Sequence, residues 1–388
     1  MWQSLKNVYH LTIAVLANIW FGFPSRKLTV IGVTGTDGKT TTVGLIYHIL
    51  HVSGASASMV STIGAIINGQ THDVGFHVTT PSSWKLQSFI KKASEPSSDR
   101  KFLVLEVTSH ALDQYRAWGI NFTVGVLTNV THEHLDYHKT WERYVKAKVR
   151  LLKAAKIALI NKDDESYKQV SNLKFTTYGK RGADVTFGQF KFTTKLIGEF
   201  NKYNILAAVG VCKALGISDA DIRKGIETFT PPIGRQEIVH EGEFMVMIDF
   251  AHTPNSFEKI LPEIKRITKG RLIHVFGAAG KRDDTKRPLM GEVSAKYADI
   301  IVLTAEDPRG EDVNSINKQI MEGIEKSKEK REVYSIVDRK EAIIFAIGLA
   351  KKGDTVFLTG KSHEKSMNYS GAEEQWSEYE AVEEALKT

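Results

Sequence analysis

Residues 30–42 read Val-Ile-Gly-Val-Thr-Gly-Thr-Asp-Gly-Lys-Thr-Thr-Thr, a run of residue types suited to holding phosphate groups. The apolar run 28–33 is typical of a buried parallel strand, and residues 41–50 favour a helix. Glycines between the two let the backbone approach a ligand, and N–H groups at a helix start hold anionic oxygens. Lys39 would reach the outer phosphates, and Thr40 would ligate Mg²⁺. The segment therefore predicts a nucleoside triphosphate site.

The glycine spacing departs from the common phosphate-loop pattern. That pattern has a glycine at the place of Val33, whereas here Gly32 and Gly35 flank it. An ordinary glycine-rich turn is the alternative interpretation. Because Lys39 and three threonines follow the glycines directly, the phosphate site is favoured.

Composition sets the outer limits of the interpretation. A chain of 388 residues is expected to form roughly two or three domains. Its hydrophobic content of 42% and charged content of 25% are typical of a soluble globular protein. The net charge of +7 is interspersed, which favours anionic substrates or a membrane face and not nucleic acid. Cys212 is the only cysteine, so internal disulfides and cysteine zinc sites are excluded, and a cytoplasmic location fits.

The N-terminal stretch 8–23 is largely apolar but is interrupted by His10 and Asn18, and it is too short to predict a membrane span. No cleavage site for a signal peptide follows it. One interpretation is a helix packed on the domain behind it. The other is an interfacial helix that makes peripheral contact with a membrane, with aromatic residues beside Arg26 and Lys27.

Apolar strands alternate with helix-like stretches along most of the chain, which predicts the α/β class with parallel sheets. The expected strands in the first half are 28–33, 102–107, 124–128 and 157–160. Those in the second half are 245–249, 272–276, 300–304 and 356–359. Residues 201–215 and 219–228 favour helices, residues 174–196 favour short antiparallel strands, and the Glu-rich tail after residue 373 favours a solvated helix.

Pro231-Pro232-Ile233-Gly234 is the clearest linker signal, so the expected units are a helical segment 1–27, a phosphate-loop domain 28–233 and a Rossmann-like domain 234–388. Glu106 ends an apolar strand, where a carboxylate would point into the ligand crevice and suit Mg²⁺. His132, His134 and His138 could suggest zinc, although their spacing matches no standard zinc pattern.

Taken together, these motifs resemble the Mur ligases, ATP-dependent amide-forming enzymes of peptidoglycan synthesis. Within that family the chain is most similar to the members that add the third residue of the stem peptide. The likeness rests on Gly35-Thr36-Asp37-Gly38-Lys39-Thr40-Thr41, Phe200-Asn201-Lys202-Tyr203-Asn204, Asp249-Phe250-Ala251-His252 and Gly360-Lys361-Ser362-His363-Glu364. Asp37, Glu133, Glu306, Asp307 and Ser362 stand where the family usually has other residues.

The resemblance implies a set of roles for the ATP side. Two Mg²⁺ ions would be held through Thr40, Glu106 and His134, and Lys148 would be carbamylated by CO₂, with Lys146 as the competing lysine. Lys39, Lys148, His134 and Arg235 would be the catalytic residues. The loop Gly35–Thr41 would bind ATP together with Asn204, Arg235, Asp249 and His252.

The resemblance also implies two substrate sites. The muramyl-peptide acceptor would contact Thr79, Thr80, Thr108, Gln114 and Arg116. The incoming amino acid would contact Arg282, Glu306, Asp307, Arg309, Gly360 and Glu364. An Arg at position 309 offers a two-pronged donor for a distal carboxylate, which favours meso-diaminopimelate over lysine.

About 27 residues precede the first expected strand, too few for the family's uridine-nucleotide domain, so the nature of the acceptor stays open. We predict an ATP-dependent ligase, monomeric and cytoplasmic, that forms an acyl phosphate on a muramyl-dipeptide acceptor. The alternatives are a related ligase that acts on a lipid-linked, peptide or glutamate acceptor, and a non-catalytic nucleotide-binding regulator.

Overall fold

A computed structural model describes residues 2–75, 79–95, 101–131, 133, 135–170 and 174–387, with backbone alone at 2–5, 135 and 136. The chain divides into two compact units, Met1–Thr230 and Pro231–Thr388. Each unit has its own sheet and its own hydrophobic core, so each is described by itself.

In the described part of the N-terminal unit, a sheet has the strand order β4-β3-β2-β5-β1-β6-β7-β8-β9. Its central strand β1 pairs in parallel with β5 on one side and with β6 on the other. The strands are β1 (Thr29–Thr34), β2 (Ser56–Ser61), β3 (Gly64–Ile67), β4 (Gln70–His72), β5 (Lys101–Glu106), β6 (Phe122–Leu127), β7 (Ile157–Asn161), β8 (Thr176–Gly179) and β9 (Val185–Thr186).

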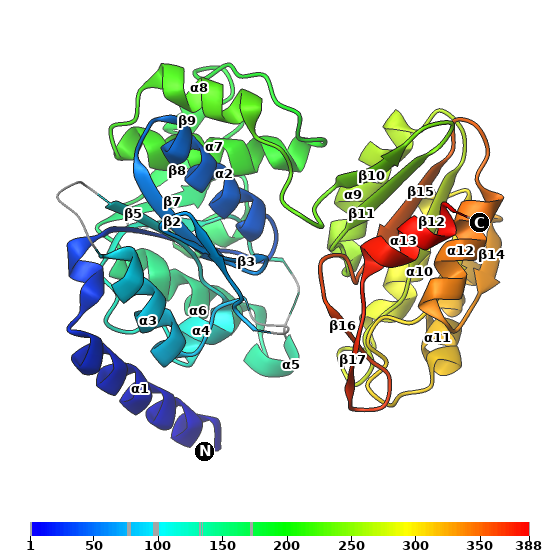
Figure 1. The fold of residues 1–388 in the computed structure, drawn as a ribbon, viewed down its shortest axis with the longest axis horizontal. Coiled ribbons are helices and arrows are strands. Elements are labelled where there is room, and N and C mark those ends of the chain that lie inside the picture. The colour runs from blue at the N-terminus through cyan, green and yellow to red at the C-terminus, as the bar shows by residue number, and fades with distance from the viewer. Residues whose placement is uncertain are drawn as a thin grey trace. The chain divides into compact units, whose positions relative to one another are not determined.

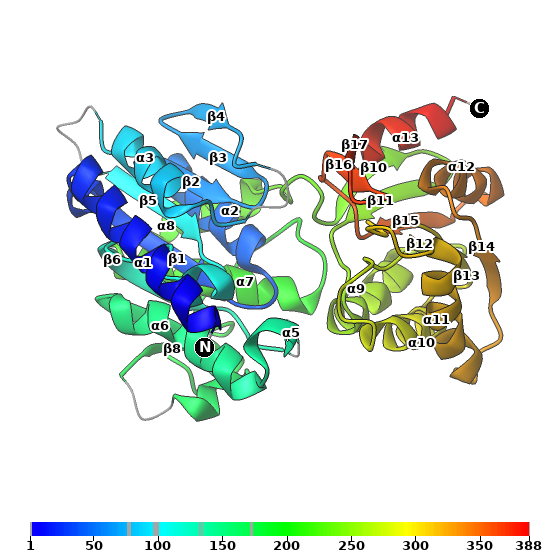
Figure 2. The ribbon, with the colours of Figure 1, turned by 90° about the horizontal axis from the view of Figure 1, so that it is seen from below.

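Helices cover both faces of this sheet, with α2, α7 and α8 on one face and α1, α3, α4 and α6 on the other (Figures 1 and 2). Their apolar sides form the cores that bury strand residues such as Val33 and Leu103. The helices are α1 (Trp2–Phe21), η1 (Pro24–Lys27), α2 (Lys39–Val52), α3 (Ser83–Ala93), α4 (Ser109–Asp113), α5 (Leu135–His138), α6 (Trp141–Ala154), η2 (Glu165–Gln169), α7 (Glu199–Ala214) and α8 (Asp219–Thr228).

The C-terminal unit has a sheet in the order β10-β11-β15-β12-β13-β14, parallel except for the edge strand β10, and a small hairpin of β16 and β17. Helices α9 and α10 lie on one face and α12 and α13 on the other (Figure 2). The bounds are β10 (Glu237–Glu241), β11 (Met245–Asp249), α9 (Pro254–Ile267), β12 (Leu272–Phe276), α10 (Lys286–Tyr297), β13 (Ile300–Leu303), α11 (Val313–Lys326), β14 (Glu332–Ser335), α12 (Arg339–Leu349), β15 (Thr355–Thr359), β16 (Ser366–Asn368), β17 (Glu373–Gln375) and α13 (Glu378–Ala385).

The α/β class and the two parallel sheets are confirmed, and each expected strand is found within two residues of its expected bounds. The expectation of antiparallel strands in 174–196 is wrong, because β8 and β9 extend the main sheet in parallel. A short turn joins them, held by the Asp184 carboxylate, which accepts bonds from the backbone N–H (2.7 Å) and the hydroxyl (2.8 Å) of Thr177.

The C-terminal tail is helical over α13, as expected, but the prediction that it is solvated is wrong. Glu378 is fully buried at its start, and Ala381, Val382 and Ala385 pack into the core beside α12. Glu378 pairs with Arg339, whose side chain is also fully buried. The acidic composition of the tail suggested a helix surrounded by water. It does not reveal that one of these Glu side chains is buried in an ion pair while others stay exposed.

Candidate active site

The phosphate loop lies between β1 and α2, and the strand beside it holds it in place. The backbone N–H groups of Thr36 and Asp37 donate to the carbonyl and the side-chain oxygen of Asn129, both at 2.9 Å. Thr128 and Asn129 donate in turn to the Asp37 carbonyl at 2.7 and 3.0 Å. The loop is therefore rigid because β6 ends directly next to it.

Two glycines of the loop are required by close contacts. A Cβ at Gly35 would lie 1.7 Å from the Thr128 hydroxyl oxygen. A Cβ at Gly38, where φ is 78°, would lie 2.2 Å from Oδ1 of Asn204 on α7. Asn204 is thereby placed against the loop, and its amide also donates to Asn201 at 2.9 Å.

Lys39 and Thr40 begin α2, at its positive end. The Lys39 ammonium donates to the Thr36 carbonyl at 2.7 Å, and so it lies over the loop. The Thr40 hydroxyl donates to the Glu106 carboxylate at 3.0 Å, and the Thr62 N–H donates to the same oxygen at 3.0 Å. Glu106 is buried at the end of β5, so a carboxylate and a hydroxyl meet where the phosphates would lie.

Lys148 is the second lysine at the loop, and it is fully buried on α6. Its ammonium donates to the Gly35 carbonyl at 2.6 Å and lies 4.2 Å from the ring centre of Tyr144. Burial, followed by repulsion from Lys39, holds the pKa of Lys148 well below its ordinary value, while Glu133 acts in the opposite direction. A neutral amine is therefore accessible at this position. Lys146, the competing lysine, is exposed.

His134, predicted as a metal ligand, lies outside the described residues, as does His132. Across the described ranges no group of three or more His, Cys, Asp or Glu side chains could hold a metal ion. The zinc alternative gains no support from His138, whose ring nitrogen is 3.0 Å from the Ser109 hydroxyl.

The predicted acceptor residues are joined by one chain of hydrogen bonds. The Thr80 hydroxyl donates to the Glu106 carbonyl and accepts from the Thr108 N–H, both at 3.0 Å. Arg116 donates to the Thr80 carbonyl at 3.2 Å and to the Gln114 side chain at 2.5 Å. Thr79 accepts from the Thr62 hydroxyl at 3.1 Å. The predicted acceptor residues are therefore linked to one another and to Glu106.

In the C-terminal unit, Arg235 and Asp249 lie together at the ends of β10 and β11. The Arg235 guanidinium lies over the ring of Phe250, 4.5 Å from its centre. The Asp249 carboxylate accepts from the N–H groups of Gln236 and Ala251 at 2.8 and 2.7 Å. Burial raises the pKa of Asp249, although Arg235 acts against that rise. His252 follows and contacts the Phe250 carbonyl at 2.8 Å.

The predicted amino-acid residues gather around a fully buried lysine that the sequence analysis did not single out. Lys361 donates to Asp307 at 2.8 Å and to Glu364 at 2.7 Å. Arg309 is 3.7 Å from the other Asp307 oxygen. We call Lys361, Asp307, Glu364, Arg309 and Glu306 the Lys361 cluster.

Glu306 is the least satisfied member of the Lys361 cluster. Its Oε2 atom is buried without a hydrogen-bond partner among the described residues. A Cβ at Gly360 would lie 2.3 Å from that atom, so only glycine leaves room for it. Burial raises the pKa of Glu306 to about 7, while Lys286 and His252 oppose the rise.

The serine in Gly360-Lys361-Ser362 has a physical explanation. Ser362 has φ of 53°, a left-handed conformation that favours glycine. Its hydroxyl donates to the Gly234 carbonyl at 2.8 Å, which compensates for the strain. Arg282, also predicted for this site, is exposed.

A further contact that the sequence analysis missed supports this site. Arg287 makes two bonds to Glu311, at 2.6 and 2.9 Å, and holds the pKa of that carboxyl down to about 2. Arg287 also donates to the Ala279 carbonyl at 3.1 Å, so it ties the glycine turn 277–280 to the segment of Arg309. Its place in the sequence between Arg282 and Glu306, two predicted site residues, was the available signal.

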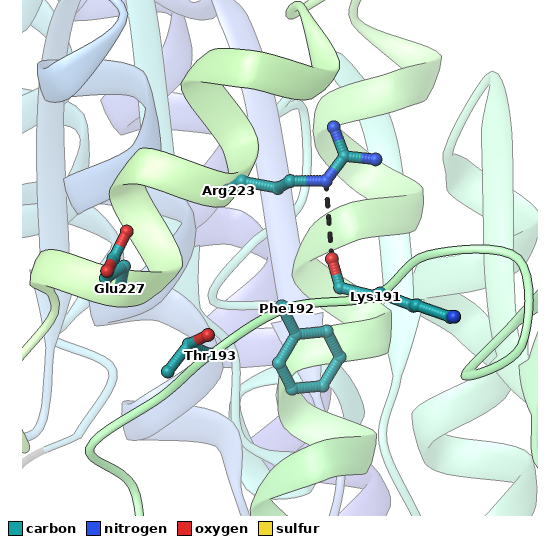
Figure 3. Close-up of a pocket in the computed structure, with 5 residues that line it drawn as sticks. All are labelled: Lys191, Phe192, Thr193, Arg223 and Glu227. Carbon is teal, nitrogen blue, oxygen red and sulfur yellow. Dashed lines mark hydrogen bonds between the residues drawn. The ribbon is translucent and has the colours of Figure 1, made fainter.

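A hollow beside α8 is separate from these residues. Figure 3 shows its lining of Lys191, Phe192, Thr193, Arg223 and Glu227, with the Arg223 side chain donating to the Lys191 carbonyl at 3.3 Å. It contains none of the predicted site residues. In the described part of the chain, no helix combines the length and the apolar character that crossing a membrane requires.

Two family models match the chain in sequence order. The Mur ligase middle domain matches residues 33–212, and the Mur ligase, glutamate ligase domain, matches residues 234–362.

Curated relatives match over almost the whole chain. A UDP-N-acetylmuramoyl-L-alanyl-D-glutamate–2,6-diaminopimelate ligase of Aquifex aeolicus is 38% identical over 392 residues, covering 95% of this chain and 80% of the relative. The ligase of the same name from Geobacillus thermodenitrificans is 38% identical over 384 residues, covering 91% and 77%.

Solved structures agree. A structure of a UDP-N-acetylmuramoyl-L-alanyl-D-glutamate–2,6-diaminopimelate ligase matches with a TM-score of 0.60 and 29% identity, covering 93% of this chain and 78% of that one. The folylpolyglutamate synthase of Mycobacterium tuberculosis, complexed with ADP and AMPPCP, has a TM-score of 0.70 at 16% identity, covering 90% and 92%, and so shows the shared fold.

The fold and the phosphate loop define an α/β nucleotide-dependent ligase. The chain belongs to the Mur ligase family, and it is an ATP-dependent ligase that acts on small-molecule substrates. Enzymes of this family use ATP and Mg²⁺.

Proposed function

We propose that this chain adds meso-diaminopimelate to a muramyl-dipeptide acceptor with hydrolysis of ATP to ADP and phosphate. The acceptor carboxylate attacks the terminal phosphorus of ATP and forms an acyl phosphate while ADP leaves. The amine of the amino acid then attacks the acyl carbon, and phosphate and a proton are released. The observation that carries the proposal is the Lys361 cluster, which combines the carboxylates of Asp307 and Glu364 with the guanidinium of Arg309.

The ATP-side residues support the first step. Lys39 and the start of α2 would hold the outer phosphates, and Arg235 would add positive charge. Thr40 and Glu106 present oxygen atoms, the ligands that Mg²⁺ prefers, so the donor set fits this ion, with His134 as a further proposed ligand. When bound, Mg²⁺ would neutralise phosphate charge. The nucleoside of ATP is proposed to be bound by Asn204, Asp249 and His252.

Lys148 is proposed to carry a carbamate. Only a neutral amine reacts with CO₂, and burial lowers the pKa of Lys148 toward that form. The neutral amine and CO₂ would give a carbamate anion and release one proton, so attraction to Lys39 would replace the repulsion that a charged Lys148 meets. The carbamate N–H would still donate to the Gly35 carbonyl, and the carbamate oxygens would attract the Lys39 ammonium.

The Lys361 cluster supports the choice of amino acid. The ammonium groups of diaminopimelate would lie near Glu364 and Asp307, and its distal carboxylate would accept bonds from Arg309. Lysine has no distal carboxylate and would make no bond to Arg309, which disfavours it. Thr79, Thr80, Thr108, Gln114 and Arg116 are proposed to hold the acceptor.

Further parts of the proposal concern the setting of the enzyme. We propose domain limits of 28–233 and 234–388 after a helical segment 1–27, and a monomeric enzyme. Because the reaction consumes ATP, we place it in the cytoplasm, with peripheral membrane contact through residues 8–23.

Phosphate release from ATP tests the function. We expect Mg²⁺-dependent release that requires both UDP-N-acetylmuramoyl-dipeptide and meso-diaminopimelate, with lysine a poor substitute. Arg309→Ala should raise the KM for diaminopimelate roughly tenfold to a hundredfold, the loss expected for a charged hydrogen bond. Arg266→Ala, on the exposed side of α9, is the matched control and should leave this KM unchanged.

Equal turnover with lysine and diaminopimelate would contradict the proposed role of Arg309. ATP binding without turnover on this acceptor would exclude the acceptor and favour a lipid-linked one.

A further inference from the structure

We propose that the outward face of α1 rests on the surface of an anionic lipid bilayer. Val8, Tyr9, Leu16, Ile19 and Trp20 are between 52% and 74% exposed. Their spacing of three or four residues places them on one side of the helix, with the exposed Thr12 among them. An exposed apolar stripe of this kind, interrupted by Thr12, marks an interaction site.

The helix cannot turn this stripe inward, because its other side is already fixed. Ala14, Ala17 and Asn18 are fully buried against the unit. The Asn18 amide donates to the Trp118 carbonyl at 2.8 Å, and the Asn7 amide donates to Asp113 at 3.3 Å. The apolar stripe therefore stays at the surface of the folded protein.

Helix α3 extends the stripe with an aromatic side chain. Trp84 on α3 is exposed and packs against Trp20 and Phe21 of α1, with ring centres 5.9 and 5.4 Å apart. Figures 1 and 2 show α1 and α3 side by side on the outside of the unit. Tryptophan and tyrosine are the side chains that prefer the boundary between lipid headgroups and acyl chains.

The charges around α1 match an anionic surface. The first acidic residue of the chain is Asp37, whereas Lys6, Arg26 and Lys27 precede it, and all three are exposed. Helix α3 also lacks acidic residues and carries Lys85, Lys91 and Lys92, of which Lys91 is paired at 2.8 Å with Glu95 just after the helix. Asp113, the acidic side chain against α1, is itself paired with Arg150 at 3.2 Å. Basic residues beside an apolar face bind anionic lipids.

These charges also argue for lipid over a second copy of the chain. A symmetric dimer through α1 would bring Lys6, Arg26 and Lys27 of one copy against the same positive residues of the other, with no acidic partner in either helix. A bilayer offers both the apolar layer for the stripe and the negative charge for its flanks.

The contact between α1 and the bilayer is connected to the proposed reaction through the position of this helix. Asn7 bonds to Asp113, which directly precedes the proposed acceptor residues Gln114 and Arg116. Through this contact the inner side of α1 adjoins the segment of the proposed acceptor residues, while its outer side would face the bilayer. The lipid contact itself does not depend on the proposed function, since binding to vesicles needs no turnover.

Vesicle flotation of the full chain tests the inference. We compare phosphatidylcholine vesicles with vesicles that also contain phosphatidylglycerol. Binding should require phosphatidylglycerol and fall as salt rises. Replacing Ile19 and Trp20 together by Glu should weaken binding at least about tenfold, which corresponds to about 1.4 kcal/mol. Leu289→Glu on α10, a side chain that is 50% exposed like Leu16, is the matched control and should bind as the parent does.

Three outcomes would overturn the inference: no binding to either vesicle, equal binding to both, or full binding by the double Glu variant. A dimer in light scattering that the same variant abolishes would assign the stripe to a second copy instead. Phosphate release without vesicles should be the same in the parent and the double variant, so failure of the lipid contact is distinct from failure of the ligase.

Discussion

Several of the charged side chains at the proposed sites are buried. Lys148, Lys361, Glu106 and Glu306 are all removed from water, yet each lies at the end of a strand or on a helix that faces a proposed substrate. Burial of a charge is unfavourable unless a partner compensates for it, so the partner of each residue indicates its role. Lys361 has two carboxylates, whereas Lys148 has a carbonyl, an aromatic ring and a repelling lysine.

The first residue-scale prediction concerns Lys148. Lys148→Ala should lower kcat by roughly a hundredfold or more, the effect of losing one preorganised charged group. Lys146→Ala, two residues away and exposed, should leave kcat unchanged. Labelled bicarbonate should give a carbamate carbon signal in NMR of the parent and of Lys146→Ala, but not of Lys148→Ala. A signal that survives Lys148→Ala would refute the assignment.

The second residue-scale prediction concerns Glu306. Burial raises the pKa of its carboxyl group from 4.5 to about 7. Between these two values the folded state holds a proton that the unfolded state has lost, so the contribution of Glu306 to stability falls as pH rises through this window. Glu306→Gln should therefore raise the melting temperature more at pH 8 than at pH 5. The free-energy difference is on the order of 3 kcal/mol.

Melting curves of the parent and Glu306→Gln across this pH range provide the measurement. Glu332→Gln on β14, an exposed side chain, serves as the control and should show no such trend. A pH-independent difference for Glu306→Gln would mean that Glu306 is not protonated in the folded state.

At the scale of elements, one ion pair joins α13 to the sheet of the C-terminal unit. Arg339 bonds to Glu378 at the start of α13 and donates to the carbonyls of Ala305 and Thr359, at the ends of two strands. The guanidinium thus holds together the segments that lead into Glu306 and Gly360. The last helix is for this reason part of the support of the proposed amino-acid site.

Glu378→Ala should destabilise the protein by roughly 3–5 kcal/mol, because it removes the carboxylate that pairs with the buried charge of Arg339. Glu383→Ala on the same helix removes an exposed partner of Lys387, and its denaturation midpoint should stay that of the parent. Urea denaturation followed by circular dichroism measures both. A Glu378→Ala midpoint equal to that of Glu383→Ala would contradict this view of α13.

At the scale of the whole molecule, the separate cores predict that each unit folds alone. A fragment 231–388 and a fragment 1–230 should each melt cooperatively, since each keeps a complete sheet covered on both faces. Neither fragment alone should release phosphate, because the proposed reaction uses residues from both.

Circular dichroism melting of the fragments provides the test. Fragment 301–388 is the control that should not fold, because it lacks β10, β11 and β12 from the middle and edge of the sheet. A non-cooperative melt of 231–388 would show that this unit depends on the other.

The local sequence pattern was enough to predict the structure of those parts of this protein whose residues are contiguous in the chain. The phosphate loop, the strand that precedes it and the helix that follows are contiguous, so residues 28–52 predicted their own structure. The parallel strands were predictable for the same reason, since each is a short apolar run between polar segments. The strands β8 and β9 were misjudged because the direction in which a strand pairs is set by its place in the sheet: β8 runs parallel to β7, and β9 runs parallel to β8.

The sequence by itself determined the family, the α/β class and the types of side chain offered to ATP and to an amino acid. Only the tertiary structure decided which charges are buried and what compensates for them. Lys361 lies between two carboxylates, Glu378 pairs with Arg339, and one oxygen of Glu306 has no hydrogen-bond partner among the described residues. It also decided that the apolar side of α1 faces outward. The physical reason is that burial and ion pairing depend on contacts between residues far apart in the chain, which composition and periodicity do not record.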